Sequence, residues 1–279
     1  FSVEIGPDGG VYILDWHDQD ICGNRTIHGA TGPIYRIMHK DAKRVTPPNL
    51  PALSDAKLVA LQVHNNDWYV RQARLLLAHR AAAGKLDKGV RAKLSDMFKA
   101  QTTSPLRLRA LWALHCVGGA DEPTLLELLN HEDENVRGWA VQLLCEQRQP
   151  SAEARKKFAT MAATEDSAVV RLNLASALQR MPDDQRWPVI NGLVKHGEDA
   201  DDHNIPKLIW FGIEPIVKED PKQALAVASK GKIPLLRQHV ARRLAASAGT
   251  TPSRDGSSTD ARALTAILQR VAPGFSMAA

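Results

Sequence analysis

The chain has 279 residues and a formal net charge of +5, so it is long enough to bury a sizeable core in one or two domains. No run approaches the eighteen consecutive apolar residues typical of a membrane-spanning helix. The three cysteines are too widely spaced for a zinc site or a disulfide framework, and no Cys-x-x-Cys-His motif for covalent haem attachment occurs.

The first part of the chain predicts a short β-hairpin. The stretch "GPDGG" at residues 6–10 combines glycines with a proline and an aspartate, which is typical of a tight turn. Val11–Leu14 then gives a short β-branched and aromatic run, and "GPIYRI" at residues 32–37 is its natural partner strand. Because two strands alone are only marginally stable in water, we expect this hairpin to be part of something larger.

Between these two strands, "DWHDQDICGNRTIHG" gathers carboxylates, imidazoles and a thiol within fourteen residues. They are Asp15, His17, Asp18, Asp20, Cys22 and His28. Oxygen ligands suit calcium, and mixed nitrogen and oxygen ligands suit transition metals. The spacing matches no established metal-binding loop, and the alternative is a solvated polar loop that caps the strands.

The rest of the chain contains an internal repeat. A ten-residue pattern begins with an aliphatic residue, carries arginine second in five of six copies, and then repeats small or apolar residues along one helical face. The copies start 30 to 36 residues apart, at Val70, Leu106, Val136, Val170, Ile205 and Leu236. Each is preceded by an apolar helical segment: Asp55–His64, Lys88–Ala100, Thr124–Asn130, Ala152–Ala163, Asp184–His196 and Pro221–Ser229.

One helical hairpin cannot bury its own apolar face, but stacked neighbours can. The sequence therefore predicts a mainly α fold, a HEAT-type α-solenoid of about six helical pairs over residues 46–248. We expect Cys116 and Cys145, late on two neighbouring second helices, to be small buried hydrophobes.

The repeated arginines predict a ladder, by which we mean a row of arginine contacts that link successive repeats. They are Arg71, Arg107, Arg137, Arg171 and Arg237, and acids precede the repeat starts at Asp67, Asp133, Asp166 and Asp202. Each guanidinium can donate to acids or carbonyls in neighbouring turns, so we interpret the row as a structural link between repeats. The alternative is an anion-binding stripe.

One repeat departs from the others. In "DHNIPKLIWFGIEPIV", residues 202–217, Pro206 replaces the arginine and lies where a first helical turn tolerates it. Pro215 should end or kink the helix near Glu214 and open a gap in the stack. Trp210 is expected to pack, and Glu214 to cap exposed amides or face a partner.

Three stretches of the sequence resemble the planctomycete-type membrane-bound dehydrogenase-like, haem-binding multidomain proteins. They are residues 202–217, "GPDGGVYILDW" and "GPIYRI". In that family a β-propeller related to glucose/sorbosone dehydrogenases leads into HEAT repeats, and a cytochrome c domain commonly follows. Pro33 stands where that family usually has arginine. The resemblance implies an internal fragment, with its domains at residues 1–45 (terminal blade remnant and exit strand), 46–248 (solenoid), 249–258 (linker) and 259–279 (terminal helix and tail).

By the same resemblance, the segment is a non-catalytic scaffold in an exported, periplasmic redox protein. It would position the propeller relative to the cytochrome, with these domains as partners and a concave face for a protein or polysaccharide. No cofactor is expected within the segment itself.

Alternatively, the complete protein to which the segment belongs is a quinone- or haem-linked sugar or alcohol dehydrogenase whose pocket includes the Asp15–His28 loop. Its cofactors would be haem c, calcium or a quinone, with Asp15, His17, Asp18 and His28 as metal ligands. A third hypothesis is a nucleic-acid-binding HEAT protein, but no cluster of basic and aromatic residues supports it.

Overall fold

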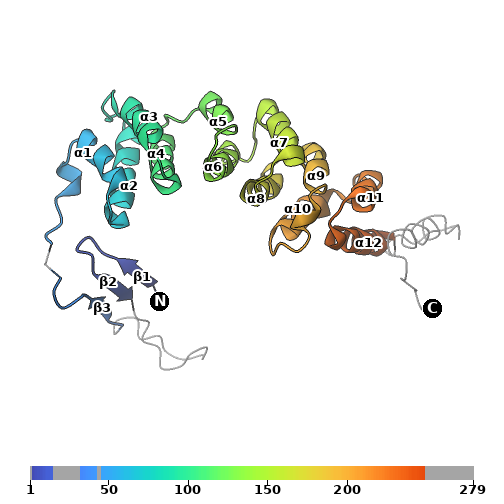
Figure 1. The fold of residues 1–279 in the computed structure, drawn as a ribbon, viewed down its shortest axis with the longest axis horizontal. Helices are drawn as coiled ribbons and strands as arrows, with labels where there is room; N and C mark the ends of the chain where they lie inside the picture. The colour runs from blue at the N-terminus through green and yellow to red at the C-terminus, as the bar shows by residue number, and fades with distance from the viewer. Residues whose placement is uncertain (1, 15–31, 43–44, 249–279) are drawn as a thin grey trace, which may run out of the picture. The chain divides into compact units, whose positions relative to one another are not determined.

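A computed structural model describes residues 2–14, 32–42 and 45–248 of the chain. In these residues it is mainly helical, with twelve α-helices and one small sheet (Figure 1). The chain divides into two units, Phe1–Asp121 and Glu122–Ala279, so the division falls inside residues 46–248. The predicted linker at 249–258 and terminal helix at 259–279 lie outside the described residues. Within the described part, no helix is both long and apolar enough to cross a membrane.

The first unit begins with an antiparallel sheet of three strands in the order β1-β2-β3. They are β1 (Ser2–Ile5), β2 (Val11–Leu14) and β3 (Ile34–Ile37). The pairing of β2 with β3 agrees with the predicted hairpin, and β1 is a strand that the sequence analysis missed. The turn between β1 and β2 contains Gly9 at φ +80°, a conformation that strongly favours glycine.

Four helices complete the first unit: α1 (Asp55–Ala60), α2 (Asp67–Ala82), α3 (Val90–Ala100) and α4 (Ser104–Cys116). A 3₁₀ turn at Leu61–Val63 extends α1. The side chain of Asn66 caps α2 by accepting a hydrogen bond from the Trp68 amide. Leu58, Leu77 and Leu94 are fully buried, so the apolar stripes of these helices form the core of this unit.

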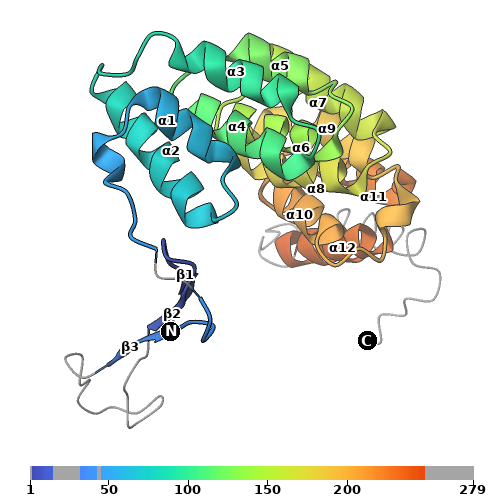
Figure 2. The ribbon, with the colours of Figure 1, turned by 60° about the vertical axis from the view of Figure 1, so that its left-hand side comes forward.

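The second unit holds four further helical pairs. They are α5 (Glu122–Leu128) with α6 (Glu134–Leu144), α7 (Ala152–Thr164) with α8 (Ala168–Ala177), α9 (Trp187–Leu193) with α10 (Ile205–Ile213), and α11 (Pro221–Lys230) with α12 (Pro234–Ala248). Within this unit α7 packs on α9, and α6 packs on α8, which packs on α10, so first and second helices form separate layers (Figures 1 and 2). All six predicted helical pairs are therefore present, and within each unit they pack as expected of a HEAT-type α-solenoid.

One apolar cluster runs through the second unit from Leu126 to Leu244. Phe158, Leu178 and Ile209, which belong to three different helices or turns, are all completely buried in it. Each hairpin thus completes its core with side chains of its neighbours, which is what the repeat pattern requires.

The unusual repeat ends as its prolines predict. Pro206 lies in the first turn of α10, and the helix stops at Ile213 before a 3₁₀ turn at Glu214–Ile216. The expected gap is absent here, because Ile213, Ile216 and Val217 are buried. The 3₁₀ turn lets the chain bend without leaving the apolar core.

The expectation for the cysteines was half wrong. Cys145 is buried, and this burial raises the pKa of its thiol to about 12. Cys116, the last residue of α4, is exposed. Cys145 lies just after the last residue of α6 and is nevertheless completely buried, so the place within the repeat does not decide the exposure of either thiol.

We expect Gly192→Ala to lower the free energy of unfolding by about 1–3 kcal/mol, as overpacked cores do. A Cβ at Gly192 would lie 2.7 Å from the carbonyl carbon of Ala162, and this backbone atom cannot move aside easily. Gly89→Ala is the matched control, since a Cβ there meets nothing within 4 Å. Urea denaturation followed by circular dichroism measures both. Equal stabilities of the two variants would contradict this close packing of α9 on α7.

Candidate functional site

Arg171 makes a buried polar contact with two hydrogen bonds to one carboxylate. Its Nε and Nη2 donate to Oδ2 and Oδ1 of Asp199, each over 2.6 Å, and both side chains are only 3% exposed. Its Nη1 donates to the carbonyl of Glu165 over 2.9 Å. The hydrogen bond to Asp199 raises the pKa of Arg171, while burial opposes this shift. One guanidinium therefore joins the inter-helix turns of two successive repeats.

Arg137 repeats this arrangement one hairpin earlier. Its Nε and Nη2 donate to Oε2 and Oε1 of Glu165 over 3.1 and 2.7 Å, and its Nη1 donates to the His131 carbonyl over 2.8 Å. Both arginines thus reach a carbonyl six residues back and a carboxylate 28 residues ahead. The receiving acids are Glu165 and Asp199, whereas Asp202 accepts the amides of Asn204 and Ile205 at the start of α10.

The other repeated arginines make different contacts. Arg107 and Arg237 each donate to the carbonyl six residues back, over 2.8 Å to Gln101 and 3.5 Å to Gly231. Among the described residues, the buried Nε of Arg237 has no hydrogen-bond partner. Arg71 is about half exposed and pairs with Glu4 of the sheet over 3.2 Å. Arg109, which the sequence analysis missed, reaches Asp67 over 3.1 Å.

Where Pro206 replaces the arginine, the ladder is interrupted. The turn that follows α11, "SKGKIP" at residues 229–234, carries no carboxylate, so donor and acceptor are missing together. In their place the Lys232 amide donates to the Val194 carbonyl over 2.8 Å. A backbone hydrogen bond thus joins these two repeats.

Trp210 and Glu214 of the same repeat lie close to α12. Trp210 is half-buried and stacks on the ring of His239, with 5.0 Å between ring centroids. Burial lowers the pKa of His239, and Arg242 adds to this shift, while the charge of Glu214 opposes it. Trp210 therefore packs, as its size predicts, whereas Pro215 is exposed.

A second polar site joins the sheet to the first helical pair. The turn at residues 6–10 offers two backbone carbonyls to the start of α2. Asn66 Nδ2 donates to the Gly6 carbonyl over 2.9 Å, and the Tyr69 hydroxyl donates to the Pro7 carbonyl over 3.0 Å. With the Arg71–Glu4 pair, three contacts connect the sheet to one helix.

The same turn is stabilised by one of its own side chains, that of Asp8. Asp8 accepts hydrogen bonds from the Gly10 amide and the Tyr12 hydroxyl, both over 3.0 Å, and forms an ion pair with Arg36. The Gly10 hydrogen bond is the main cause that lowers the pKa of Asp8. A Cβ at Gly6 would lie 2.2 Å from the Tyr12 ring, so any larger residue there would force this ring to move away from its present position. The turn therefore presents its carbonyls in a fixed geometry.

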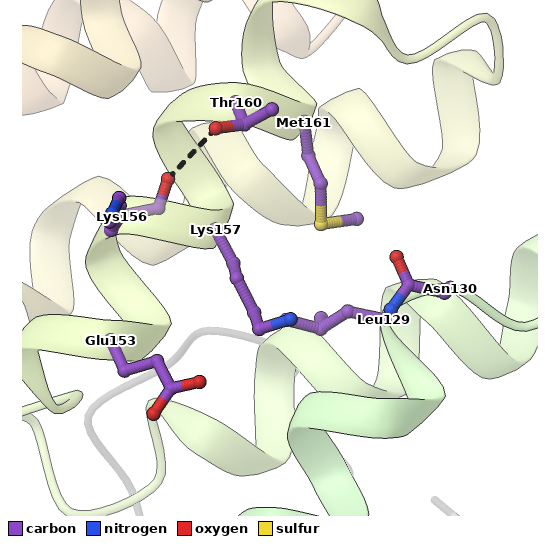
Figure 3. Close-up of a pocket in the computed structure, with 7 residues that line it drawn as sticks. All are labelled: Leu129, Asn130, Glu153, Lys156, Lys157, Thr160 and Met161. Atoms are coloured by element: carbon purple, nitrogen blue, oxygen red, sulfur yellow. Dashed lines mark hydrogen bonds between the residues drawn. The ribbon is translucent and has the colours of Figure 1, made fainter.

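Two open hollows lie within the units. One, of about 570 Å³, lies beside the sheet and is lined by Val3, Ile5, Trp68 and Arg71 among others. The other, of about 460 Å³, lies on the second unit, where Lys157 and Met161 point toward Leu129 and Asn130 (Figure 3). Neither hollow gathers the convergent buried polar groups of a catalytic site.

The predicted metal ligands Asp15, His17, Asp18 and His28 lie outside the described residues. Across residues 2–14, 32–42 and 45–248, no group of three or more His, Cys, Asp or Glu side chains is placed to hold a metal ion.

A family model described as HEAT repeats matches residues 122–205, which agrees with this architecture. A search of curated proteins finds no significant match. An engineered protein is similar at 21% identity, with a TM-score of 0.37, over 81% of this chain and 100% of its own. A designed armadillo repeat protein in complex with the peptide (KR)4 is similar at 15% identity, with a TM-score of 0.36, over the same shares.

We expect Arg171→Met to lower the free energy of unfolding by about 3–5 kcal/mol, because Asp199 is left as a buried charge without its partner. Replacing both residues, as in Arg171→Met with Asp199→Leu, should recover much of this loss. Arg71→Met is the control, and its half-exposed pair should contribute about 0–1 kcal/mol. Similar losses for Arg171→Met and Arg71→Met in urea denaturation would refute the buried link.

The pH dependence of the turn follows from Asp8. Its folded-state pKa lies below the ordinary 3.8, so the ionised carboxylate stabilises the turn above that pH, and this stabilisation is lost as pH falls through the lowered value. The Gly10 amide proton should therefore titrate in NMR spectra with a midpoint below 3.8. Asp8→Asn should abolish this titration. A midpoint at or above 3.8 in the unsubstituted chain would contradict a hydrogen bond from the Gly10 amide that stabilises the ionised Asp8 carboxylate.

Proposed function

We propose that this chain is the HEAT-repeat scaffold of an exported multidomain redox protein. It holds a dehydrogenase-like β-propeller at a fixed position relative to a c-type cytochrome domain. The sheet formed by β1, β2 and β3 is then the end of the last propeller blade, as the resemblance of its turn and strands implies.

The observation that carries the proposal is the junction between the sheet and α2. Asn66 and Tyr69 bind two consecutive carbonyls of the turn, and Asp8 fixes the turn from the other side. A flexible tether would need no such contacts, since its residues could stay solvated. This junction therefore favours a rigid coupling of whatever the sheet belongs to with the first helical pair.

The links between repeats extend the same rigidity along the second unit. Arg137 and Arg171 join successive turns through paired hydrogen bonds of planar geometry, which fix orientation as well as distance. A tethered electron acceptor meets its donor at an effective concentration set by the length and stiffness of the connection. A stiff helical spacer thus suits transfer between two redox centres of one polypeptide.

The test uses the full-length gene product with D-glucose as the probe substrate. Asn66→Ala with Tyr69→Phe should slow reduction of the haem, followed by its absorbance, several-fold while dye-linked glucose oxidation stays unchanged. Lys195→Ala, at an exposed position, is the control and should alter neither rate. The absence of a c-type haem spectrum, or equal haem reduction in the junction variant and the original protein, would overturn the proposal.

A further inference from the structure

The hollow on the second unit lies beside a face of α7 that its helical neighbours leave uncovered. On one side α7 packs closely on α9, whereas on the other side it scarcely contacts α5, the preceding first helix. The space of about 460 Å³ that results is lined by Leu129 and Asn130, just after α5, and by α7 residues between Glu153 and Met161 (Figure 3). We call this space the α7 hollow.

The floor of the α7 hollow is apolar. Leu129 is only 3% exposed and belongs to the apolar cluster of the second unit. Met161 is half-buried against the same cluster. A flexible thioether adapts to apolar side chains of different shapes, and methionine is common on surfaces that bind several partners. The floor is therefore suited to receive an apolar side chain.

The rim of the α7 hollow is basic, and its cations have no partners. Among the described residues, neither Lys156 nor Lys157 forms an ion pair or a side-chain hydrogen bond. Glu153 precedes them by three and four residues, a spacing at which glutamate and lysine pair on many helices. Lys157 instead extends toward Leu129 and Asn130 (Figure 3). Since α7 carries three basic residues and this one acid, a negatively charged partner is complementary to it.

The shape of the α7 hollow decides between classes of ligand. Pockets for small molecules bury most of their ligand, and this open hollow would leave much of one exposed. Single-stranded nucleic acids need aromatic side chains on which bases stack, and none is among the described residues that line the hollow. An acidic protein segment needs only what the hollow offers, which is an apolar floor beside two lysines.

We propose that the α7 hollow is a docking site for a short acidic segment of a partner protein. One apolar side chain of the segment enters between Leu129 and Met161. Carboxylates on either side of it accept hydrogen bonds from Lys156 and Lys157, which are strong because both groups are charged. This inference goes beyond the proposed function and holds without a propeller or a haem.

Fluorescence anisotropy tests the proposal with a labelled peptide of three Glu-Glu-Leu-Leu repeats as the probe. The 279-residue chain should bind it saturably, and Lys156→Gln with Lys157→Gln should weaken binding at least ten-fold. Lys222→Gln with Lys230→Gln is the matched control, because it removes the same charge from exposed positions of α11. It should change the affinity less than two-fold. Equal losses in the two variants, tighter binding of a thymidine oligonucleotide, or no saturable binding would overturn the proposal.

NMR spectra of the unsubstituted chain locate the bound peptide without any change of sequence. With methionine methyl groups labelled with ¹³C, the Met161 signal should shift as the same peptide is added. The Met181 signal is the internal control and should stay in place, since Met181 is only 3% exposed in the same unit. An unshifted Met161 signal at saturation, or an equal shift of both signals, would contradict docking in the α7 hollow.

Discussion

The second unit depends on one constraint: no helical hairpin in it can bury its apolar face without the next hairpin. Gly212 of α10 lies against the Leu178 side chain of the preceding repeat, and Gly192 of α9 lies against the backbone of Ala162 in α7, so neither position leaves room for a Cβ. A single cluster joins Leu126 to Leu244 as a result. Stability is then a sum of neighbour contacts, as in other repeat proteins, rather than the property of one central core.

The arginine links add specificity to this packing. A buried ion pair contributes little net stability relative to apolar residues of the same size, but it penalises any arrangement in which the charges are unpaired. Arg137 and Arg171 therefore favour one orientation of each turn against the next. At Pro206 the guanidinium and its acid are both absent, and a backbone hydrogen bond from Lys232 takes their place.

The sequence is sufficient for features that depend on local chemistry. Apolar spacing, caps and prolines place all six helical pairs, and Pro215 places the end of α10. The sequence is insufficient where a structure or a contact depends on segments that are far apart in the chain. Ser2–Ile5 is a strand only because it pairs with β2, and the choice of Glu165 and Asp199 as acceptors depends on stacking geometry 28 residues away. The docking of the turn through Asn66 and Tyr69 likewise joins residues about sixty positions apart.

The most direct test of this account is the circular dichroism of residues 151–180, the α7–α8 hairpin alone, against residues 122–248 with all four hairpins. The account predicts little helix and no cooperative thermal transition for the single hairpin, since its apolar face has no neighbour to cover it. It predicts a cooperative transition for the four hairpins together. A stable, cooperatively melting single hairpin would contradict the claim that neighbours share one core.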